Sequence, residues 1–277
     1  MKPLDAARRP GFPLRMPAAT SQTGATKLIA GHAREIDAAG LKYTQKQPQK
    51  PVSSAAKGVA TGLGLDSQAV RARMVQKLAA QGVQDSRVLA AMEQIERHRF
   101  VDSALVNQAY EDTSLPIGLG QTISKPNVVA RMLELLVKDC NGKLGRVLEI
   151  GTGCGYQAAL LAQLATEVYS IERLRGLHDR ARDNLRPLRV ANLHLLFGDG
   201  MLGYAKGAPY AAIIAAAGGE ALPQAWIDQL AVGGRLVAPV QGANGAQALV
   251  VVDKTARGLT RTLLEAVHFV PLKSGTS

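Results

Sequence analysis

Cysteine is scarce in this chain of 277 residues, and aromatic residues make up only 4% of it. The two cysteines, Cys140 and Cys154, form no CxxC pair and no Cys/His cluster, so the sequence predicts neither a disulfide framework nor a zinc site. Their isolation favours a reducing compartment. The few aromatic side chains are not interleaved with basic clusters, which argues against a stacking platform for nucleic acid.

Long apolar runs are also missing. No stretch reaches the roughly 20 residues that a membrane-spanning helix needs. The first residues lead into Arg8, Arg9 and Pro10 rather than into the apolar segment of a secretory signal. The sequence therefore predicts a soluble, cytoplasmic protein with no membrane partner.

Charge is unevenly distributed along the chain. The formal net charge is +11, and residues 1–66 hold ten Lys and Arg against four Asp and Glu, which leaves a surplus of five for residues 67–277. Because residues 1–66 have few large apolar side chains, we predict a basic, disordered extension before a folded domain at 67–277. A weak likeness of this segment to an organellar transit peptide is opposed by Asp5. The mild charge of the domain argues against a specific nucleic-acid partner.

Helical periodicity opens the folded part. Apolar residues recur at helical spacing from Ser67 to the stop signal Gly82, and a second helix is expected from about Asp85. The side of that helix expected to face solvent carries Glu93, Glu96 and Arg97. Residues 67–140 are thus predicted to hold N-terminal helices and the loop LPIGLGQTISKP, which leads into a further helix.

Short apolar runs alternate with helical stretches in residues 141–277. The runs RVLEIG, EVYSIE, LHLLFGD, YAAIIAA and GGRLVAPV read as strands, and ALVVVDK and LLEAVHFVPL as later, antiparallel ones. Alternation of this kind predicts an α/β protein with a doubly wound, mostly parallel open sheet, to which the N-terminal helices are added.

The strongest chemical signal is VLEIGTGCGY, in which a strand runs into Gly151, Gly153 and Gly155 before a helix. Glycines at such a turn let the backbone approach a ligand closely, and the helix N-terminus offers unpaired N–H groups. A dinucleotide fingerprint would need a small residue at position 156, where this chain has Tyr156.

Two acidic residues follow at the ends of the next strands. Glu172 lies twenty-one residues after Gly151, where a carboxylate can accept both hydroxyls of a ribose. Asp199, followed by Gly200, ends the third strand and is placed to reach an adenine amino group. Three strand ends in this order predict binding of S-adenosylmethionine.

Seven segments in this order resemble the protein-L-isoaspartate O-methyltransferases: LPIGLGQTISKP, RVLEIGTGCGYQAALLA, SIE, GDG, PQAWIDQL, GGRLVAPV and FVPL. The resemblance covers roughly residues 67–273 and implies the fold of the S-adenosylmethionine-dependent methyltransferases. It also implies methyl esterification of the free carboxylate of L-isoaspartyl and D-aspartyl residues in damaged proteins and peptides, which initiates their repair.

Roles for single residues follow from the same resemblance. Ser124 would be the active-site residue, beside the substrate carboxylate and the methyl donor, and Val270 would lie against the isoaspartyl peptide. The cofactor would be bound by Thr122, Gly151, Thr152, Gly153, Gly155, Glu172, Asp199 and Gly200. An ionised carboxylate needs no general base, so a hydroxyl at Ser124 would only have to hold and orient it. The alternative is that Ser124 merely caps the following helix.

Three departures from the family pattern keep other readings open. Ala211 stands where relatives carry Asp, the loop at 216–220 is altered and expected to be looser, and His268 precedes FVPL in place of Arg or Tyr. One alternative is a methyltransferase for RNA or a small molecule, and the absence of NPPY- and PC-type signatures counts against base methylation. The other alternative is a cofactor-binding protein without turnover. No heptad seam is present, so we expect a monomer.

Overall fold

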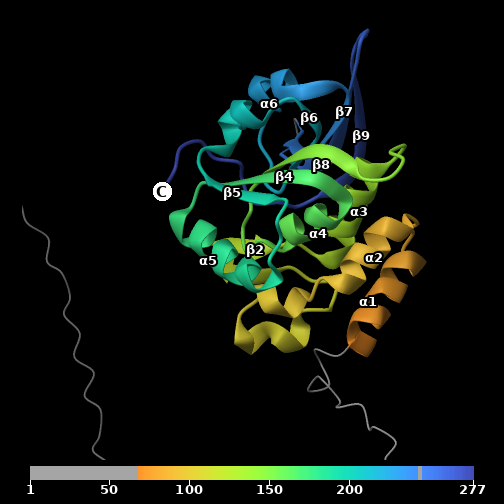
Figure 1. Cartoon of the computed structure of the whole chain (residues 1–277), viewed down its shortest axis with the longest axis vertical. Coiled ribbons are helices and arrows are strands. Elements are labelled where there is room, and N and C mark those ends of the chain that lie inside the picture. The colour runs from red at the N-terminus through yellow and green to blue at the C-terminus, as the bar shows by residue number, and fades with distance from the viewer. Residues whose placement is uncertain (1–67, 243–244) are drawn as a thin grey trace, which may run out of the picture. The chain divides into compact units, whose positions relative to one another are not determined.

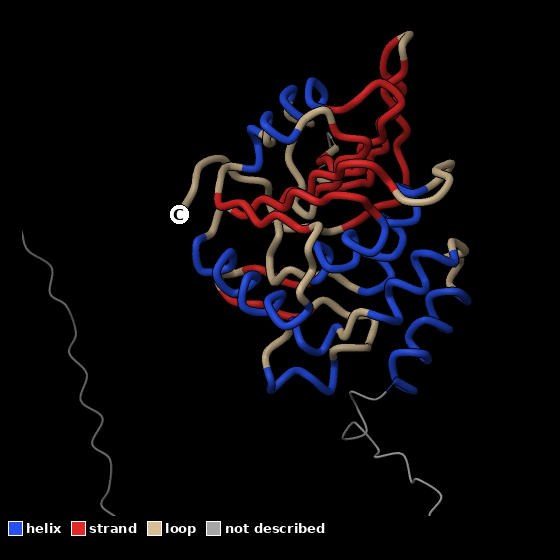
Figure 2. Tube along the Cα trace, in the orientation of Figure 1, coloured by secondary structure: helices blue, strands red, loops and turns tan. Residues whose placement is uncertain are grey.

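The computed structural model describes residues 68–242 and 245–277, all within a compact unit that spans Gly58–Ser277 (Figures 1 and 2). The predicted extension at residues 1–66 lies outside the described residues. Within the described part, no helix is long and apolar enough to cross a membrane.

A seven-stranded sheet in the order β5-β4-β3-β6-β7-β8-β9 forms the centre of the fold. Its strands are β3 (Leu144–Ile150), β4 (Ala165–Glu172), β5 (Leu193–Phe197), β6 (Tyr210–Ala215), β7 (Leu230–Gln241), β8 (Gln247–Thr255) and β9 (Gly258–Val267). The pairs from β5 to β7 are parallel, and β8 pairs antiparallel with both β7 and β9. The predicted open, mostly parallel sheet is confirmed, including its antiparallel later strands.

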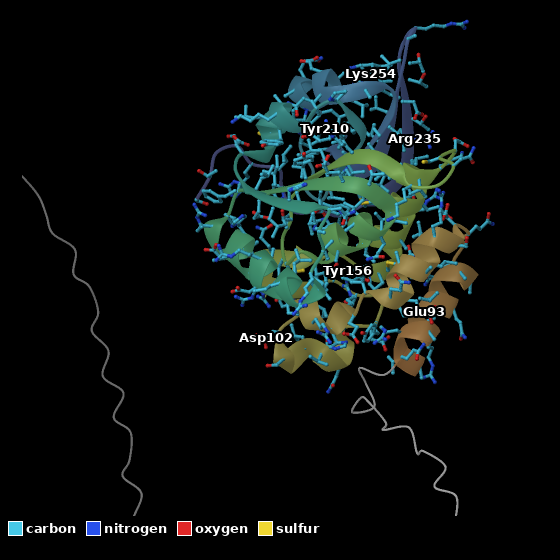
Figure 3. All side chains as sticks on the ribbon, viewed as in Figure 1. Glu93, Asp102, Tyr156, Tyr210, Arg235 and Lys254 are labelled. Atoms are coloured by element: carbon cyan, nitrogen blue, oxygen red, sulfur yellow. The ribbon has the colours of Figure 1, made fainter. Side chains whose placement is uncertain are left out.

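One face of the sheet is covered by a thick helical layer (Figure 1). It contains α1 (Gln68–Ala80), α2 (Ser86–Gln94), α3 (Pro126–Val137), α4 (Tyr156–Leu164) and α5 (Arg175–Leu185). Alternate strand residues such as Val147 and Val168 pack into this layer and are fully buried. The label of Tyr156 in Figure 3 marks the start of α4, between the sheet and the N-terminal helices.

The opposite face has a thinner cover. The short helix α6 (Gln224–Gln229) packs there with the 3-10 turns at Gly200–Leu202 and Ala205–Gly207. Its core gathers Leu148, Ile213 and Leu236 from the strands around Trp226, which is 1% exposed. Helices on both faces make the fold doubly wound, as predicted.

The sequence LPIGLGQTISKP forms a small hairpin rather than the irregular loop that we predicted. Strand β1 (Leu115–Gly118) pairs antiparallel with β2 (Gln121–Ile123), and the turn between them uses positive φ angles at Leu119 and Gly120. Arg180 of α5 donates from Nη1 to the Ile117 carbonyl at 2.7 Å. Hairpin formation was missed because alternation of buried and exposed residues extends over only a few positions here.

The expectation that Arg97 faces solvent was wrong. Helix α2 ends at Gln94, Ile95 is extended with φ −85° and ψ 117°, and Arg97 begins a 3-10 turn, Arg97–Phe100. This break changes the helical phase, so the Arg97 side chain turns inward and is 0% exposed.

Beyond β9 the chain returns across the carboxyl ends of the parallel strands. Gly218 donates to the Val270 carbonyl, and Leu272 donates to the Gly218 carbonyl. Further along, Ser277 donates to the Arg173 carbonyl and accepts from the Arg175 amide. This C-terminal segment, residues 268–277, forms one wall of the site described next.

Candidate active site

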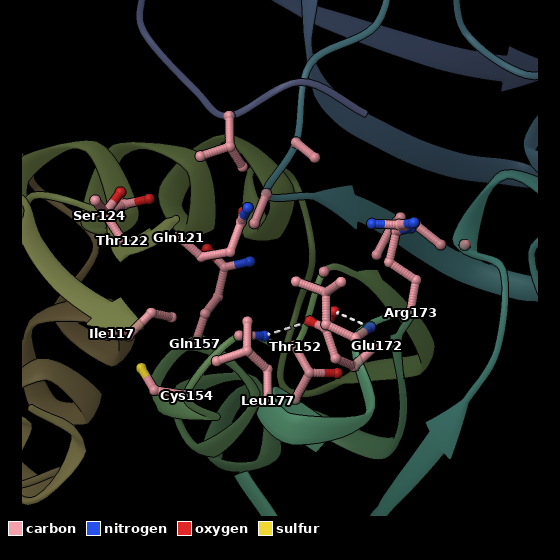
Figure 4. A pocket seen from close by; sticks show the side chains of 18 of the residues that line it. Ile117, Gln121, Thr122, Ser124, Thr152, Cys154, Gln157, Glu172, Arg173 and Leu177 are labelled. Carbon is pink, nitrogen blue, oxygen red and sulfur yellow. Dashed lines mark hydrogen bonds between the residues drawn. The ribbon is translucent and has the colours of Figure 1, made fainter. Parts of the chain in front are cut away.

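A cleft of about 300 Å³ lies at the carboxyl ends of β3 and β4, between the hairpin and the C-terminal segment (Figure 4). Eight of the ten residues that the sequence singled out line it: Thr122, Ser124, Gly151, Thr152, Gly153, Glu172, Gly200 and Val270. The other two, Gly155 and Asp199, lie next to it without lining it. Parallel strands whose carboxyl ends meet at one edge bring these distant segments together.

The glycine turn after β3 has the conformation that only glycine adopts readily. Gly151 has φ 89° and Gly153 has φ 57°. A Cβ atom on Gly153 would come within 3.2 Å of the Ile117 side chain of the hairpin. The turn therefore leaves a shallow surface of backbone open to a ligand between the sheet and the hairpin.

Gly155 is required for the start and packing of helix α4 and does not line the cleft. It is the N-cap of α4 with φ 91°, and a Cβ there would lie 2.8 Å from Leu185 Cδ1 of α5. Glycine is thus needed for close packing of α4 on α5, and no contact with a ligand is required to explain it.

Glu172 is 5% exposed and stands at the end of β4 with its carboxylate held from both sides. Oε2 accepts from the Gly153 amide and Oε1 from the Leu174 amide, both at 2.9 Å. Each carboxylate oxygen keeps a further lone pair, so the group can still accept two hydroxyl donors. Figure 4 shows these two hydrogen bonds at the opposite end of the cleft from Ser124.

Asp199 is engaged by the protein itself. Its Oδ1 accepts from the Met201 amide at 2.8 Å, and its Oδ2 accepts from the Gly275 amide of the C-terminal segment at 2.6 Å. The neighbouring Gly200 lines the cleft, and its carbonyl accepts from Trp226 Nε1 at 2.8 Å. The sequence could not indicate this use of Asp199, because the contact depends on a segment seventy-six residues further along.

Ser124 follows the hairpin and faces the cleft. The N-cap of α3 is Lys125, which makes no side-chain cap, and the Ser124 hydroxyl has no hydrogen-bond partner within the part of the chain that the structure describes. Its carbonyl accepts from Arg97 Nη2 at 2.7 Å. The capping alternative is therefore not supported, and the hydroxyl is free to bind a ligand.

Sequence analysis missed a buried polar network behind the glycine turn. Thr152 Oγ1 lies 2.6 Å from Ser170 Oγ, which donates to the carboxylate of Glu149. Glu149 is fully buried, and burial raises its pKa to about 8 against the lowering effect of the Ser170 hydrogen bond. The available signal was a charged residue inside the apolar strand VLEIG.

The three departures from the family pattern either do not line the cleft or are accommodated by the surrounding structure. Ala211 is the second residue of β6, at the opposite end of the strand from the cleft-lining Ala216. Gly218 is hydrogen-bonded to the C-terminal segment, and a Cβ there would lie 2.7 Å from the Gln247 side chain, so the looser loop is not observed. His268 is exposed and does not line the cleft.

The cleft suits a nucleoside-containing cofactor. Its glycine turn and the carboxylate of Glu172 come from two adjacent strands, and Gly200 lines it beside them. A Cβ at Gly200 would lie 2.6 Å from Ile150, so this position has to be glycine for close packing on β3. Among the described residues, no group of three or more His, Cys, Asp or Glu could hold a metal ion.

Comparisons with known proteins agree with this geometry. A family model described as "Protein-L-isoaspartate(D-aspartate) O-methyltransferase (PCMT)" matches residues 69–277. A protein-L-isoaspartate O-methyltransferase of Methylibium petroleiphilum is 63% identical over 83% of this chain and 88% of its own length. One of Leptothrix cholodnii is 55% identical over 98% of this chain and 96% of its own length.

Two solved structures have the same fold. A structure named protein-L-isoaspartate O-methyltransferase aligns with a TM-score of 0.67 at 28% identity, covering 74% of this chain and 66% of its own. A second, from Plasmodium falciparum and described as a complex with S-adenosyl-L-homocysteine, aligns with a TM-score of 0.65 at 24% identity, covering 73% of this chain and 98% of its own.

Proposed function

This chain belongs to the protein-L-isoaspartate(D-aspartate) O-methyltransferase family, and from that premise we propose how its cleft performs the reaction. The enzyme transfers a methyl group from S-adenosylmethionine to the free carboxylate of L-isoaspartyl and D-aspartyl residues in proteins and peptides. The methyl ester that forms is the first product of protein repair.

The position of the Ser124 hydroxyl supports our assignment of the end of the cleft where methyl transfer takes place, called the reacting end below. The hydroxyl faces the cleft, lacks a hydrogen-bond partner among residues 68–242 and 245–277, and lies across the cleft from the ribose-binding candidate Glu172 (Figure 4). A hydroxyl donor there can hold a carboxylate oxygen and turn the other oxygen toward the glycine turn. Val270, on the C-terminal segment, provides the apolar wall for the peptide that carries this carboxylate.

The cofactor residues divide by the part of the molecule they would hold. Gly151, Thr152 and Gly153, with Thr122 from the hairpin, would border the methionine end. Glu172 would accept the ribose hydroxyls, and Gly200 would border the adenine, with Asp199 shared between that ring and the C-terminal segment. S-adenosylmethionine, when bound, supplies a methyl group on a sulfonium, which is reactive toward a carboxylate.

The residues of the cleft need not move a proton. A carboxylate is already ionised near pH 7, so Ser124 orients it without acting as a base. The hairpin and the C-terminal segment hold the substrate from two sides, and such placement can account for a large part of the rate enhancement.

Two peptides that differ only in isoaspartate or aspartate at one position test the activity. We expect base-labile label from methyl-labelled S-adenosylmethionine on the isoaspartyl peptide alone. Label on both peptides, or on neither while the cofactor still binds, would refute the proposed specificity.

The variant Ser124→Ala tests the reacting end. Loss of one hydrogen bond to a charged group should lower kcat/KM about 10- to 100-fold while the Kd of S-adenosylmethionine stays unchanged. Ser103→Ala, at an exposed 3-10 turn, is the matched control. Equal activity of both variants would remove Ser124 from the mechanism.

We further propose that the enzyme acts in the cytoplasm as a monomer. Both cysteines are free, as a reducing compartment allows. Light scattering coupled to gel filtration, at micromolar concentration with and without cofactor, measures the oligomeric state directly.

A further inference from the structure

Arg97, at the start of the 3-10 turn Arg97–Phe100, is a fully buried charge that the mechanism above does not use. Its side chain is 0% exposed, and within the described ranges no Asp or Glu forms an ion pair with it. The charge of Asp112 acts on Arg97 only from beyond ion-pair distance, so burial of this cation is not offset by a direct ion pair and is costly.

The guanidinium lies directly behind the reacting end of the cleft. Nη2 donates to the Ser124 carbonyl at 2.7 Å and Nε to the Ala109 carbonyl at 2.8 Å, and Cζ stands 4.9 Å from the centre of the Tyr156 ring. Nη1 is buried and has no hydrogen-bond partner in the described part of the chain. Both Ser124 and Tyr156 line the cleft, so one layer of side chain and backbone separates this charge from a bound ligand.

A neutral side chain could donate hydrogen bonds to the same carbonyl groups, and burying it would cost less desolvation free energy than burying a guanidinium. Burial lowers the pKa of Arg97, but a guanidinium remains protonated at any physiological pH. A permanent, unpaired cation is therefore explained better by an anion that arrives from the cleft than by structure alone.

Two cations line the cleft itself, as Arg97 does not, and both are placed differently. Arg173 donates from Nε to the Gly275 carbonyl and lies beside Glu172, at the far end from Ser124 (Figure 4). Lys273 is exposed on the C-terminal segment, where water screens it. Arg97 is the cation that is both buried and bonded to Ser124.

We propose that Arg97 is a positioning residue whose buried charge selects the free carboxylate of the substrate and holds it at Ser124. This inference rests on the proposed function. The buried charge attracts the substrate carboxylate through the intervening layer, while the hydrogen bond to the Ser124 carbonyl fixes the loop that presents the hydroxyl. An uncharged carbonyl group bound at Ser124 would not be attracted by the Arg97 charge in this way.

Two competing peptides that differ in one charge, a substrate and its uncharged analogue, provide the test. One is the isoaspartyl peptide with its free carboxylate, and the other is the same peptide with that carboxylate as a carboxamide; each competes against a labelled isoaspartyl substrate. We expect the parent enzyme to bind the carboxylate peptide at least about tenfold more tightly than the carboxamide.

In Arg97→Gln this preference should fall to within about twofold, because only the carboxylate peptide loses affinity. The Kd of S-adenosylmethionine should not rise, since a sulfonium cation gains nothing from a neighbouring guanidinium. Arg97→Lys, assayed at pH 6, should retain the preference. Arg99→Gln removes the same charge from the exposed side of the same 3-10 turn and should match the parent.

General damage to the fold would weaken both peptides and the cofactor together, so it is distinguishable from loss of charge. If Arg97→Gln does not fold, the test relies on the parent enzyme and on Arg97→Lys. The inference is overturned if the parent does not prefer the carboxylate peptide. It is also overturned if a folded Arg97→Lys variant does not prefer that peptide. A parent that labels no isoaspartyl peptide overturns the proposed function itself. A parent that labels it, and whose preference survives in Arg97→Gln, overturns only the role of Arg97.

Discussion

Glu149 shows how a single buried carboxyl group can control stability next to a binding site. Its pKa of about 8 lies above its ordinary value of 4.5, because burial disfavours the charged form. Between these two values the folded protein keeps the proton and the unfolded chain releases it. Stability contributed by this group is therefore highest below pH 4.5 and falls as the pH rises toward 8, by about 1.4 kcal/mol per pH unit.

Glu149→Gln removes this titration while keeping the shape of the side chain. We expect the free energy of unfolding of the parent to decline relative to the variant between pH 5 and pH 8, as measured by urea denaturation at each pH. For Glu111→Gln, at an exposed position, the free energy of unfolding should change with pH in the same way as for the parent. A parent and a Glu149→Gln variant whose curves stay parallel would show that Glu149 is ionised in the fold.

Glu172→Gln probes the other buried carboxyl group of the site. An amide has only one oxygen, so it cannot accept from the two backbone amides and two ribose hydroxyls at once. We expect the Kd of S-adenosylmethionine to rise about 10- to 100-fold, by isothermal calorimetry. Glu167→Gln, at the other end of β4, should leave the Kd unchanged, and an unchanged Kd in both variants would exclude ribose binding by Glu172.

At this scale the sequence correctly placed at the cleft the residues whose position is set locally. Gly151 and Gly153 lie in the turn after β3, and Glu172 ends β4, so the strand ends alone place them at one edge of the sheet. Arg97 was misplaced because helical periodicity was extended past Ile95, where the backbone leaves the helix. Asp199 was predicted to be free for a ligand, and only the tertiary path of Gly275 reveals its second partner.

At the scale of single elements, α4 depends on close approach to α5. Gly155→Ala would place a methyl group 2.8 Å from Leu185 Cδ1 on a backbone with φ 91°, and we expect a loss of about 3 kcal/mol in the free energy of unfolding. Gly82→Ala meets nothing within 4 Å at φ 104° and should cost only about 1–2 kcal/mol.

The difference between these two glycine variants isolates the packing of α4 on α5 from backbone strain, and chemical denaturation measures it. Equal losses would mean that Leu185 moves aside and that α4 tolerates the added methyl. The hairpin β1–β2 was the element that sequence patterns failed to predict, because strands of four and three residues carry too little alternation to reveal their period.

At the scale of the whole molecule, the cleft is built from residues between Ile117 and Lys273. The sequence assigned no site residue to positions 1–60, so we expect a variant lacking them to retain kcat/KM within about twofold of the full chain in matched salt. A loss of tenfold or more would assign residues 1–60 a part in catalysis. The seven strands and the mostly parallel sheet were predicted from the alternation of apolar runs and helices. The spatial order of the strands was not predicted, and the return of the C-terminal segment over the site had no local signal.

The hydrogen bond from Trp226 to the Gly200 carbonyl places an intrinsic fluorophore next to the cleft. Trp226 is the chain's single tryptophan, so all indole emission comes from one fluorophore, 2.8 Å from the cleft-lining Gly200 carbonyl. Filling the adenine end of the cleft should alter the intensity of that emission. Cofactor association can then be followed in a stopped-flow instrument without a label, and separated in time from arrival of the peptide at Ser124.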